Sequence, residues 1–463
     1  MVRVFRHYIP SSIIWLILVE SIIFFASVSI GIELRFREGT GTEGVESHLL
    51  VKSFLFMLFM GGSLTAMGLY QRTIINDFAS MMIRIFFGFV LGFLLMTLSF
   101  YMFPELFLGR GIIGFALISA FFGVLFSRTV FIKLISTEKL RKKIVVLGTG
   151  KNAKQIEDLE YKCDQHGCQI VGYIKHNDEE ELISADKFLM LDGSISDYLI
   201  ENDISEVVVA LDDRRKKFPV DELLACKMEG VNIRDLVSFF ERITGHMQLD
   251  ALHPSSVIFS TGFGHAISQT ASKRIFDVLV SSIILLIASP VMLITGFLIY
   301  LSGMGRDPIF YRQQRVGLDG KAFDVLKFRS MKVDAEKNGA QYATKKDPRV
   351  TMIGSFIRKT RIDELPQLIN VLLGEMSFVG PRPERPEFVE KYNKSIPHYA
   401  LRHKVKPGIT GWAQICYPYG DNEADTKEKL QFDLYYLKNY SMFLDLNILF
   451  QTLQVVLFGK GAR

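Results

Sequence analysis

The sequence predicts a membrane protein with an N-terminal four-helix transmembrane bundle, a Rossmann-like α/β cytosolic module and a mainly helical, membrane-associated domain with a re-entrant helix. Three observations lead to this fold class. Hydrophobic residues make up 49% of the 463 residues, with a mean hydropathy of +0.23, which is typical of chains that face lipid. Strand-like and helical runs alternate in the middle of the chain. A second long apolar segment then opens the last part. The predicted boundaries are 1–135, 140–250, 251–271 for a linker, and 272–463.

Four apolar runs near the N-terminus are candidates to cross a bilayer, which takes about 20 residues. They cover residues 11–32, 49–70, 81–103 and 111–126. Basic residues gather before the first run, after the second and after the fourth, so both ends of this region are expected on the cytoplasmic side. The length of the first run argues against a cleaved signal peptide. Glu20 inside this run is either a functional intramembrane acid or a residue packed against another helix.

A glycine-containing turn marks the start of the α/β module. A short apolar run leads into Gly148, Gly150 and Ala153. Their GxGxxA spacing is the one that brings backbone N–H groups against a dinucleotide phosphate in Rossmann-like turns. Further strands are expected at 169–174 and 206–211, with a helix between them. This alternation predicts a parallel sheet.

The turn alone does not decide between a nucleotide site and a structural or regulatory module. A nucleotide site needs an acidic residue about 20 residues further on to hold a ribose hydroxyl. Asp178 is the candidate, but it lies in an acidic loop typical of a solvated surface. The structural interpretation is therefore favoured, and a bound nucleotide stays open.

The cysteines and the net charge argue against several kinds of site. Cys163, Cys168, Cys226 and Cys416 lie in segments expected in the reducing cytoplasm, and no CxxC pair is present. We therefore expect neither disulfides nor structural zinc. The net charge of +5 fits anionic lipid headgroups. No nucleic-acid motif is found, so no nucleic acid is expected among the partners.

The apolar segment 278–301 is long enough to span the membrane, but Ser289 and Pro290 interrupt its centre. Proline removes one helical hydrogen bond, and the neighbouring serine hydroxyl can satisfy the freed carbonyl, so a kink is expected. Basic residues flank both ends of the segment, so both ends favour the cytoplasmic side. This pattern favours a re-entrant helix over a kinked fifth span.

A pair of acidic residues, Asp363 and Glu364, carries the strongest chemical signal in the last domain. Cations that can hold phosphate oxygens lie on both sides of the pair, while carboxylates suit a metal ion or a covalent intermediate. The combination indicates phosphoryl transfer, although the pair alone is also typical of the first turn of a helix. The candidate phosphate-binding residues are Lys327, Arg329, Arg358, Arg361 and Arg382.

Seven short motifs follow one another from Lys273 to the C-terminal region. They are Lys273-Arg-Ile-Phe-Asp277, Ser289-Pro290, Gln314-Arg-Val-Gly317, Lys327-Phe-Arg-Ser-Met331, Asp363-Glu-Leu-Pro-Gln367, Ser377-Phe-Val-Gly-Pro-Arg-Pro383 and Lys406-Pro-Gly-Ile-Thr-Gly-Trp-Ala-Gln414. On these motifs the domain resembles the bacterial polyprenyl-phosphate hexose-1-phosphate transferases. With four spans and an α/β module in front, the chain resembles the long branch of this family, which initiates exopolysaccharide synthesis.

The resemblance implies a reaction and its participants. A hexose 1-phosphate would pass from a UDP-sugar to polyprenyl (undecaprenyl) phosphate with release of UMP, at the cytoplasmic side of the bacterial inner membrane. Asp363 would be the nucleophile that forms an aspartyl-phosphosugar intermediate, and Glu364 would help to hold Mg²⁺. Membrane lipids are expected partners, and a homodimer is left open.

Two other functions compete with this one. Membrane-anchored NAD-dependent sugar-nucleotide dehydratases share the front half of the architecture and need a helical YxxxK pair. Tyr342 and Lys346 have that spacing, but no glycine-rich strand-turn-helix precedes them. A nucleotide-sensing scaffold would rest on the GxGxxA turn and would leave the acidic pair and its cations unexplained.

Overall fold

The computed structural model divides the chain into two compact units, one up to Gly245 and one from His246 onward. Each unit is described by itself. The described residues are 2–4, 7–9, 11–36, 48–70, 78–135, 142–160, 163, 168–176, 179–189, 194–213, 218–249, 262–264, 267–304, 307–333, 335, 347–417 and 422–458. Asp178, Tyr342, Lys346 and most of the predicted linker lie outside these residues.

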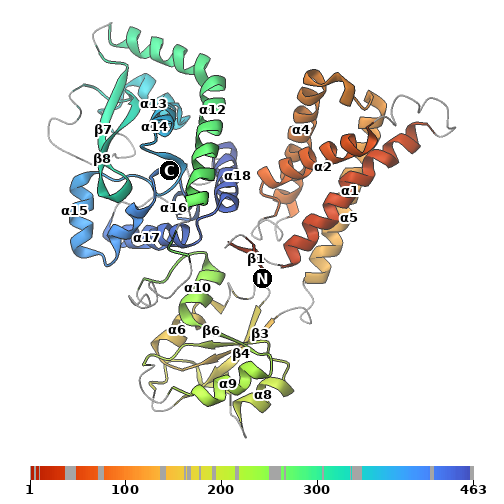
Figure 1. Ribbon diagram of the computed structural model, residues 1–463, viewed down its shortest axis with the longest axis vertical. Coiled ribbons are helices and arrows are strands. Elements are labelled where there is room, and N and C mark those ends of the chain that lie inside the picture. The colour runs from red at the N-terminus through yellow and green to blue at the C-terminus, as the bar shows by residue number, and fades with distance from the viewer. Residues whose placement is uncertain are drawn as a thin grey trace. The chain divides into compact units, whose positions relative to one another are not determined.

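Four long apolar helices form where the first four apolar runs stand (Figure 1). Each is long and apolar enough to cross a membrane. The α1 helix packs against α2 and α5, and α2 packs against α4. The fourth helix extends nine residues beyond its predicted end, because basic residues in a last turn suit the helix dipole. Their bounds are α1 Ser11–Arg35, α2 Leu49–Ala66, α4 Phe78–Met102 and α5 Arg110–Ile135, with short elements β1 Val2–Val4, β2 His7–Ile9 and η1 Pro104–Leu106.

Glu20 of α1 is fully buried and has partners for its charge. Arg128 of α5 donates from Nη2 to Glu20 Oε2 at 3.1 Å, and the Tyr70 hydroxyl donates to the same oxygen at 2.6 Å. Arg128 Nη1 also donates to the Leu69 carbonyl at 2.9 Å. A buried charge is tolerated when it is paired and hydrogen-bonded. Of the two interpretations of Glu20, the structure therefore favours packing between helices.

The middle of the chain forms a four-stranded parallel sheet in the order β4-β3-β5-β6, which confirms the predicted α/β arrangement. Its core consists of aliphatic side chains such as Val145, Leu199 and Val207. On β5, buried Glu206 accepts from Arg242 Nη1 at 2.7 Å, which ties the last helix of the module to the sheet. The elements are β3 Lys142–Leu147, α6 Lys151–Glu157, β4 Cys168–Ile174, η3 Ala185–Lys187, α8 Ile195–Glu201, β5 Glu206–Val209, α9 Val220–Met228, β6 Asn232–Asp235 and α10 Leu236–Thr244.

The expectation of no disulfide is wrong for one pair of cysteines. Cys163 and Cys168 are bonded in the structure, with their Cα atoms 5.2 Å apart, a normal span for a disulfide. Cys163 follows α6 and Cys168 is the first residue of β4, and their spacing in the sequence does not reveal the bond. Cys226 and Cys416 are free.

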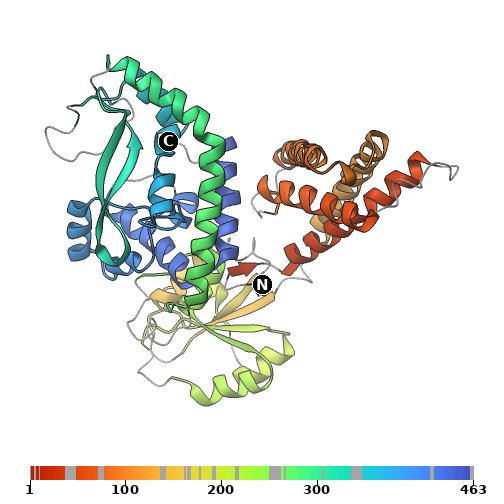
Figure 2. The same cartoon turned by 45° about the horizontal axis from the view of Figure 1, so that its top comes forward.

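The second unit is mainly helical, as predicted, but it also contains strands (Figure 2). In the antiparallel hairpin β7–β8, more and less exposed side chains alternate along β7, and a glycine-containing turn leads into β8. A short parallel pair, β9 and β10, joins two of the motifs. The elements are α12 Ile267–Ser302, β7 Phe310–Val316, η4 Leu318–Gly320, β8 Ala322–Phe328, α13 Met352–Lys359, η5 Ile362–Glu364, α14 Gln367–Leu373, β9 Ser377–Val379, α15 Pro386–Ser395, η6 Tyr399–Lys404, β10 Gly408–Thr410, α16 Trp412–Cys416, α17 Glu423–Lys438 and α18 Met442–Phe458.

The first turns of α12 are fixed to the rest of the unit by buried polar contacts. Lys273 Nζ lies 2.6 Å from Asp445 Oδ2 of α18. Asp277 Oδ1 accepts from the Ser377 hydroxyl and from the Phe378 N–H, both at 3.0 Å. Arg274 donates to the carbonyls of Val371 and Leu372 at the end of α14. The motif Lys273–Asp277 thus holds the start of α12 in place.

Farther along, α12 is a single helix that changes direction along its length (Figures 1 and 2). Pro290 lies inside it, and sharp bends in helices are usually caused by proline. Proline cannot donate to the carbonyl four residues earlier, that of Leu286. The Ser289 hydroxyl donates to this carbonyl at 2.8 Å, so the expected role of the serine is confirmed. Large apolar side chains around the bend, including Leu286, Ile287 and Leu293, are exposed.

The serine contact leads to a test of the bend. In lipid nanodiscs, Ser289→Ala should cost about 1–3 kcal/mol, because it leaves the Leu286 carbonyl without a donor in an apolar setting. In a Pro290→Ala background the same change should cost little, since the substituted alanine has the backbone N–H that proline lacks. Thermal unfolding of the four variants measures the difference. Equal losses in both backgrounds would show that Ser289 does not serve the carbonyl freed by Pro290.

Candidate active site

A cavity of about 580 Å³ opens in the second unit between the β7–β8 hairpin, the η5 turn, the segment after β9 and helices α15 to α18. It brings together the acidic pair and all five candidate phosphate-binding residues: Lys327, Arg329, Arg358, Arg361, Asp363, Glu364 and Arg382. Ser289 and Pro290 are not among its lining residues. The turn with Gly148, Gly150 and Ala153 lies in the other unit.

The backbone before the acidic pair makes an abrupt turn. Helix α13 begins at Thr351, whose hydroxyl accepts from the Gly354 N–H, and ends at Thr360. Arg361 follows with φ of 60°, a left-handed conformation that non-glycine residues rarely adopt. The chain then enters the short η5 turn, Ile362–Glu364, directly before α14. The acidic pair therefore lies between two helices instead of on one regular helix face. Backbone strain like that at Arg361 often accompanies functional sites.

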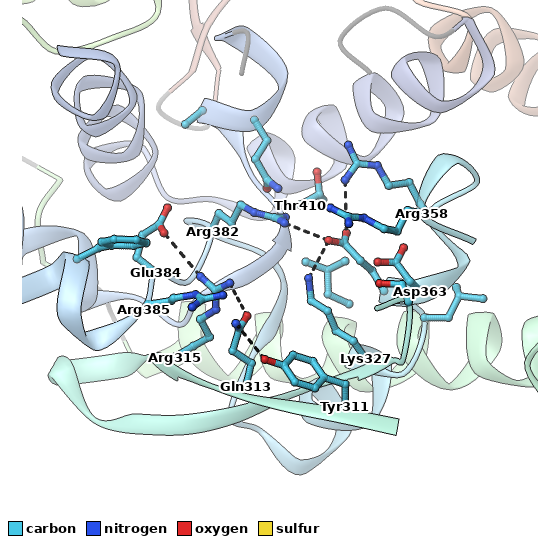
Figure 3. A pocket seen from close by; sticks show the side chains of 18 of the residues that line it. Tyr311, Gln313, Arg315, Lys327, Arg358, Asp363, Arg382, Glu384, Arg385 and Thr410 are labelled. Atoms are coloured by element: carbon cyan, nitrogen blue, oxygen red, sulfur yellow. Dashed lines mark hydrogen bonds and ion pairs between the residues drawn. The ribbon is translucent and has the colours of Figure 1, made fainter. Parts of the chain in front are cut away.

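Glu364 is held by two cations from distant parts of the sequence. Lys327 at the end of β8 places Nζ 3.2 Å from Glu364 Oε1, and Arg382 donates from Nη2 to the same oxygen at 3.0 Å (Figure 3). Arg361 Nη1 lies 4.0 Å from Oε2. Burial alone would raise the pKa of Glu364, but Lys327 and Arg382 outweigh burial and hold this pKa well below its usual range. Glu364 is therefore ionised.

Asp363 lies beside this cluster and has one carboxylate oxygen without a donor in the described part of the chain. Its side chain is buried, and Oδ1 has no hydrogen-bond donor among the described residues. Burial raises the pKa of Asp363, the negative charge of Glu364 adds to this, and Lys327, Arg358 and Arg361 oppose it. A buried oxygen without a donor is costly unless a ligand meets it. The two carboxylates thus differ in role: one is fixed by ion pairs and one is left available.

The remaining predicted cations surround the acidic pair less closely. Arg358, near the end of α13, and Arg361 line the cavity and lower the pKa of Asp363 through their charge. Arg329 reaches the cavity from the segment after β8, and its buried Nε has no hydrogen-bond partner in the described part of the chain. Burial lowers the pKa of Lys327, and Glu364 counters this effect. Guanidinium groups around an open space suit phosphate oxygens.

A buried arginine that the sequence did not indicate supports Arg382 from behind. Arg402 lies 2.8 Å from Asp433 through Nη2, and it donates to the Tyr399 hydroxyl at 2.7 Å and to the Arg382 carbonyl at 3.0 Å. Asp433 is the one acid in the apolar run Leu430–Leu437. A lone acid in such a run indicates a buried ion pair, and this is the sequence feature that could have pointed to Asp433.

The hairpin adds a second polar group that sequence reasoning missed. Arg315 of β7 donates to Gln313 Oε1 at 2.7 Å and to the Pro383 carbonyl at 3.1 Å, and it lies 3.7 Å from Glu384 (Figure 3). Arg315 belongs to the motif Gln314–Gly317. The sequence showed this motif but did not indicate what Arg315 contacts. These contacts fix the chain next to Arg382. Arg382 itself lies between two prolines that restrict its backbone.

The acidic pair fits a divalent metal of the hard type. Mg²⁺ usually takes one or two carboxylates and completes its shell with substrate phosphates and water. The unpaired Oδ1 of Asp363 and the ionised Glu364 beside it meet this need. Among the described residues, no group of three or more His, Cys, Asp or Glu side chains forms a closed metal site.

Comparisons with known proteins agree with this geometry. A family model described as bacterial sugar transferase matches residues 268–459, and one described as a CoA-binding domain matches residues 65–234. The UDP-N-acetylgalactosamine-undecaprenyl-phosphate N-acetylgalactosaminephosphotransferase of Aeromonas hydrophila is 41% identical over 244 residues, which cover 52% of this chain and 56% of the relative. The UDP-glucose:undecaprenyl-phosphate glucose-1-phosphate transferase of Escherichia coli (strain K12) is 49% identical over 194 residues, or 41% of each chain.

A third relative aligns over more of both chains. An uncharacterized sugar transferase of Haemophilus influenzae is 30% identical over 350 residues, which cover 71% of this chain and 72% of the relative. The chain spans about half the length of the Aeromonas and Escherichia relatives. The alignments with these two relatives therefore leave a large part of each of them unmatched.

The Arg402–Asp433 pair can be tested by stability. Arg402→Met should lower the free energy of unfolding by about 3–5 kcal/mol, because Asp433 is left buried without its partner. The double variant Arg402→Met with Asp433→Leu should recover much of this loss. Thermal unfolding in detergent measures both.

The control for this test lies in the same turn of the chain. Lys404 pairs with Asp319 at 3.0 Å, but both side chains are more than half exposed. Lys404→Met should therefore change stability by no more than about 1 kcal/mol. If Arg402→Met unfolded at the temperature of the unaltered chain, the proposed support of Arg382 would be wrong.

Proposed function

The chain belongs to the bacterial sugar transferase family, and from that premise we propose that it transfers a hexose 1-phosphate from a UDP-sugar to a polyprenyl phosphate such as undecaprenyl phosphate. UMP is the second product, and the reaction begins an exopolysaccharide or other surface glycan at the cytoplasmic face of the bacterial inner membrane. The observation that carries the proposal is the cavity that the five predicted cations line together with Asp363, whose buried Oδ1 has no donor among the described residues. The names of the Aeromonas and Escherichia relatives point to the same class of donor and acceptor.

Asp363 is the proposed nucleophile. One carboxylate oxygen forms a bond to the sugar-bearing phosphorus, and the P–O bond to UMP breaks, with the electron pair leaving on UMP. An oxygen of the polyprenyl phosphate then attacks the same phosphorus, and the bond to Asp363 breaks, which regenerates the free carboxylate. Covalent catalysis by a carboxylate divides one difficult transfer into two easier steps. The unpaired, buried Oδ1 of Asp363 supports this assignment.

Glu364 is proposed to orient the site and to hold the metal. Lys327 and Arg382 keep its carboxylate ionised and fix its position, so it cannot replace Asp363 as nucleophile without breaking two ion pairs. Mg²⁺, when bound, would neutralise charge on the diphosphate and on the departing UMP. Glu364 Oε2, which faces Arg361 only at 4.0 Å, is the oxygen best placed to take part.

The surrounding cations are proposed to bind the phosphates of donor and acceptor. Arginines hold phosphate oxygens with two parallel hydrogen bonds, whereas a lysine acts as a point charge. Arg382 is preorganised, because Pro381 and Pro383 restrict its backbone and Arg402 binds its carbonyl. Such fixed charges lower the barrier most when they match the charge that develops in the transition state.

We also propose that α12 enters the membrane and returns to the same side. Its first turns are held by Asp445 and Ser377, while Ile299 near its other end packs against Phe328 and Ile357. Both ends of the helix thus contact one folded unit, and the exposed apolar surface lies around the bend between them. A straight helix of this length would extend about 54 Å and would separate its ends by more than the apolar core of a bilayer.

The proposed nucleophile predicts specific losses of activity. Asp363→Asn should reduce UMP release from a UDP-sugar by on the order of 10³-fold or more, because the amide is a poor nucleophile. Glu364→Gln should also abolish turnover, since it loses its charge for Lys327, Arg382 and a metal. A panel of UDP-sugars with polyprenyl phosphate as acceptor serves both to measure these losses and to identify the sugar.

A covalent adduct separates this mechanism from direct transfer. Without acceptor, mass spectrometry should find a sugar-phosphate adduct on the peptide with Asp363, and Asp363→Asn should lack it. Glu390→Gln, an exposed change on α15, is the matched control and should retain full activity. Normal turnover by Asp363→Asn would overturn the assignment.

Labelling of single cysteines tests the path of α12. In a background without native cysteines, Ala271→Cys and the exposed Met304→Cys should react with a membrane-impermeant maleimide only after cells are lysed. Glu105→Cys, between α4 and α5, should react in intact cells, since that loop is expected on the outer face. Reaction of Met304→Cys from outside intact cells would mean that α12 crosses the membrane.

A further inference from the structure

The glycine turn of the α/β module poses a separate question, because the matching family model describes a CoA-binding domain. Such a turn binds a nucleotide phosphate when its backbone N–H groups are open to the ligand. The relevant donors lie at the end of β3 and the start of α6. In this structure, three of these donors are bound by side chains from other parts of the module.

Two carboxylates take the place that a phosphate would occupy. Asp212, just after β5, accepts from the Lys151 N–H at 2.8 Å and from the Asn152 N–H at 2.9 Å. Glu179, in the loop after β4, accepts from the Thr149 N–H at 3.0 Å. These three N–H groups lie in the glycine turn and in the first turn of α6. The chain therefore supplies its own anions to them.

Glu179 also cannot serve as the acid that holds a ribose hydroxyl. Its second oxygen accepts from the Asp212 N–H at 3.0 Å, so both oxygens are bound to backbone. The loop that carries Glu179 is fixed over the turn, because the Leu182 N–H donates to the Thr149 carbonyl at 3.0 Å. The predicted candidate, Asp178, lies outside the described residues.

The glycines themselves are explained without a ligand. A Cβ on Gly150 would lie 2.2 Å from Asp212 Oδ2, and a Cβ on Gly148 would lie 2.8 Å from the Ala210 carbonyl oxygen. Gly148 also has a φ of 127°, which side chains rarely adopt. The close approach of the module's own chain therefore requires glycine at both positions. In a nucleotide-binding turn, the close approach of a pyrophosphate would impose the same requirement.

We propose that this turn is closed by Glu179 and Asp212 and does not bind CoA, a dinucleotide or another phosphate ligand. The residues do not fit such a ligand, because it would have to displace two carboxylates and then lie beside their negative charge. Ala153 packs in the interior at the start of α6 and completes the close contact of the turn with the sheet. The module is a structural element whose anion site is filled from within.

Hydrogen exchange of the full-length protein in detergent, read by mass spectrometry on peptides covering residues 148–153, tests this directly. Millimolar CoA, NAD⁺ or pyrophosphate should leave exchange in these peptides unchanged. Asp212→Ala should speed exchange of the Lys151 and Asn152 amides by about tenfold, and Glu179→Gln should have a smaller effect at Thr149. Slower exchange across the turn in the unaltered chain on addition of any of these ligands would overturn the proposal.

Neighbouring acids provide the matched controls. Asp213→Asn and Glu180→Gln remove the same charge one residue away and should leave exchange of the turn as in the parent. Peptides from β5 and α9, in the same module, report whether each variant is folded. Unchanged exchange at Lys151 and Asn152 in a folded Asp212→Ala variant would also contradict the proposal. Ligand effects confined to peptides around residues 361–382 reflect binding at the candidate active site and are consistent with a closed glycine turn.

Discussion

The ion pairs on Glu364 organise the catalytic unit. Lys327 comes from a hairpin, Arg382 from the segment after β9, and Glu364 from the turn between α13 and α14, so one carboxylate joins three parts of the sequence. Burial of these charges is acceptable because each has a partner. Arg402 and Asp433 extend the network behind Arg382. Beside this network, Asp363 Oδ1 is buried and has no hydrogen-bond donor among the described residues.

Contacts within the same unit hold both ends of α12. Buried contacts of Lys273 and Asp277 hold its beginning, and the cluster around Ile299 holds its end. The polar contacts lie where the helix packs on protein, and the exposed apolar side chains lie around the bend. Since polar groups are expensive in lipid and apolar ones are expensive in water, this distribution supports the proposed path of α12, with its bend toward the bilayer.

The two units use acidic residues in opposite ways. In the α/β module, Glu179 and Asp212 have donors for their oxygens and close a turn that resembles a phosphate site. In the cavity, Asp363 Oδ1 has none among the described residues. The resemblance of the turn to a nucleotide motif and the resemblance of the acidic pair to a helix start were both plausible from local sequence. What separates them is whether the surrounding chain satisfies the polar groups.

The sequence by itself determined the apolar helices, the parallel strands, the proline bend with its serine, and the set of charged residues in the cavity. These follow from local properties: hydrophobic run length, strand and helix patterns, and short motifs. It did not determine the Arg402–Asp433 pair, the Cys163–Cys168 bond, or the closure of the glycine turn by Asp212. Each of these joins residues whose pairing depends on how the chain folds back, from 5 to 61 positions apart. Only the tertiary structure decides which buried charges find partners, because pairing energy depends on distances in space.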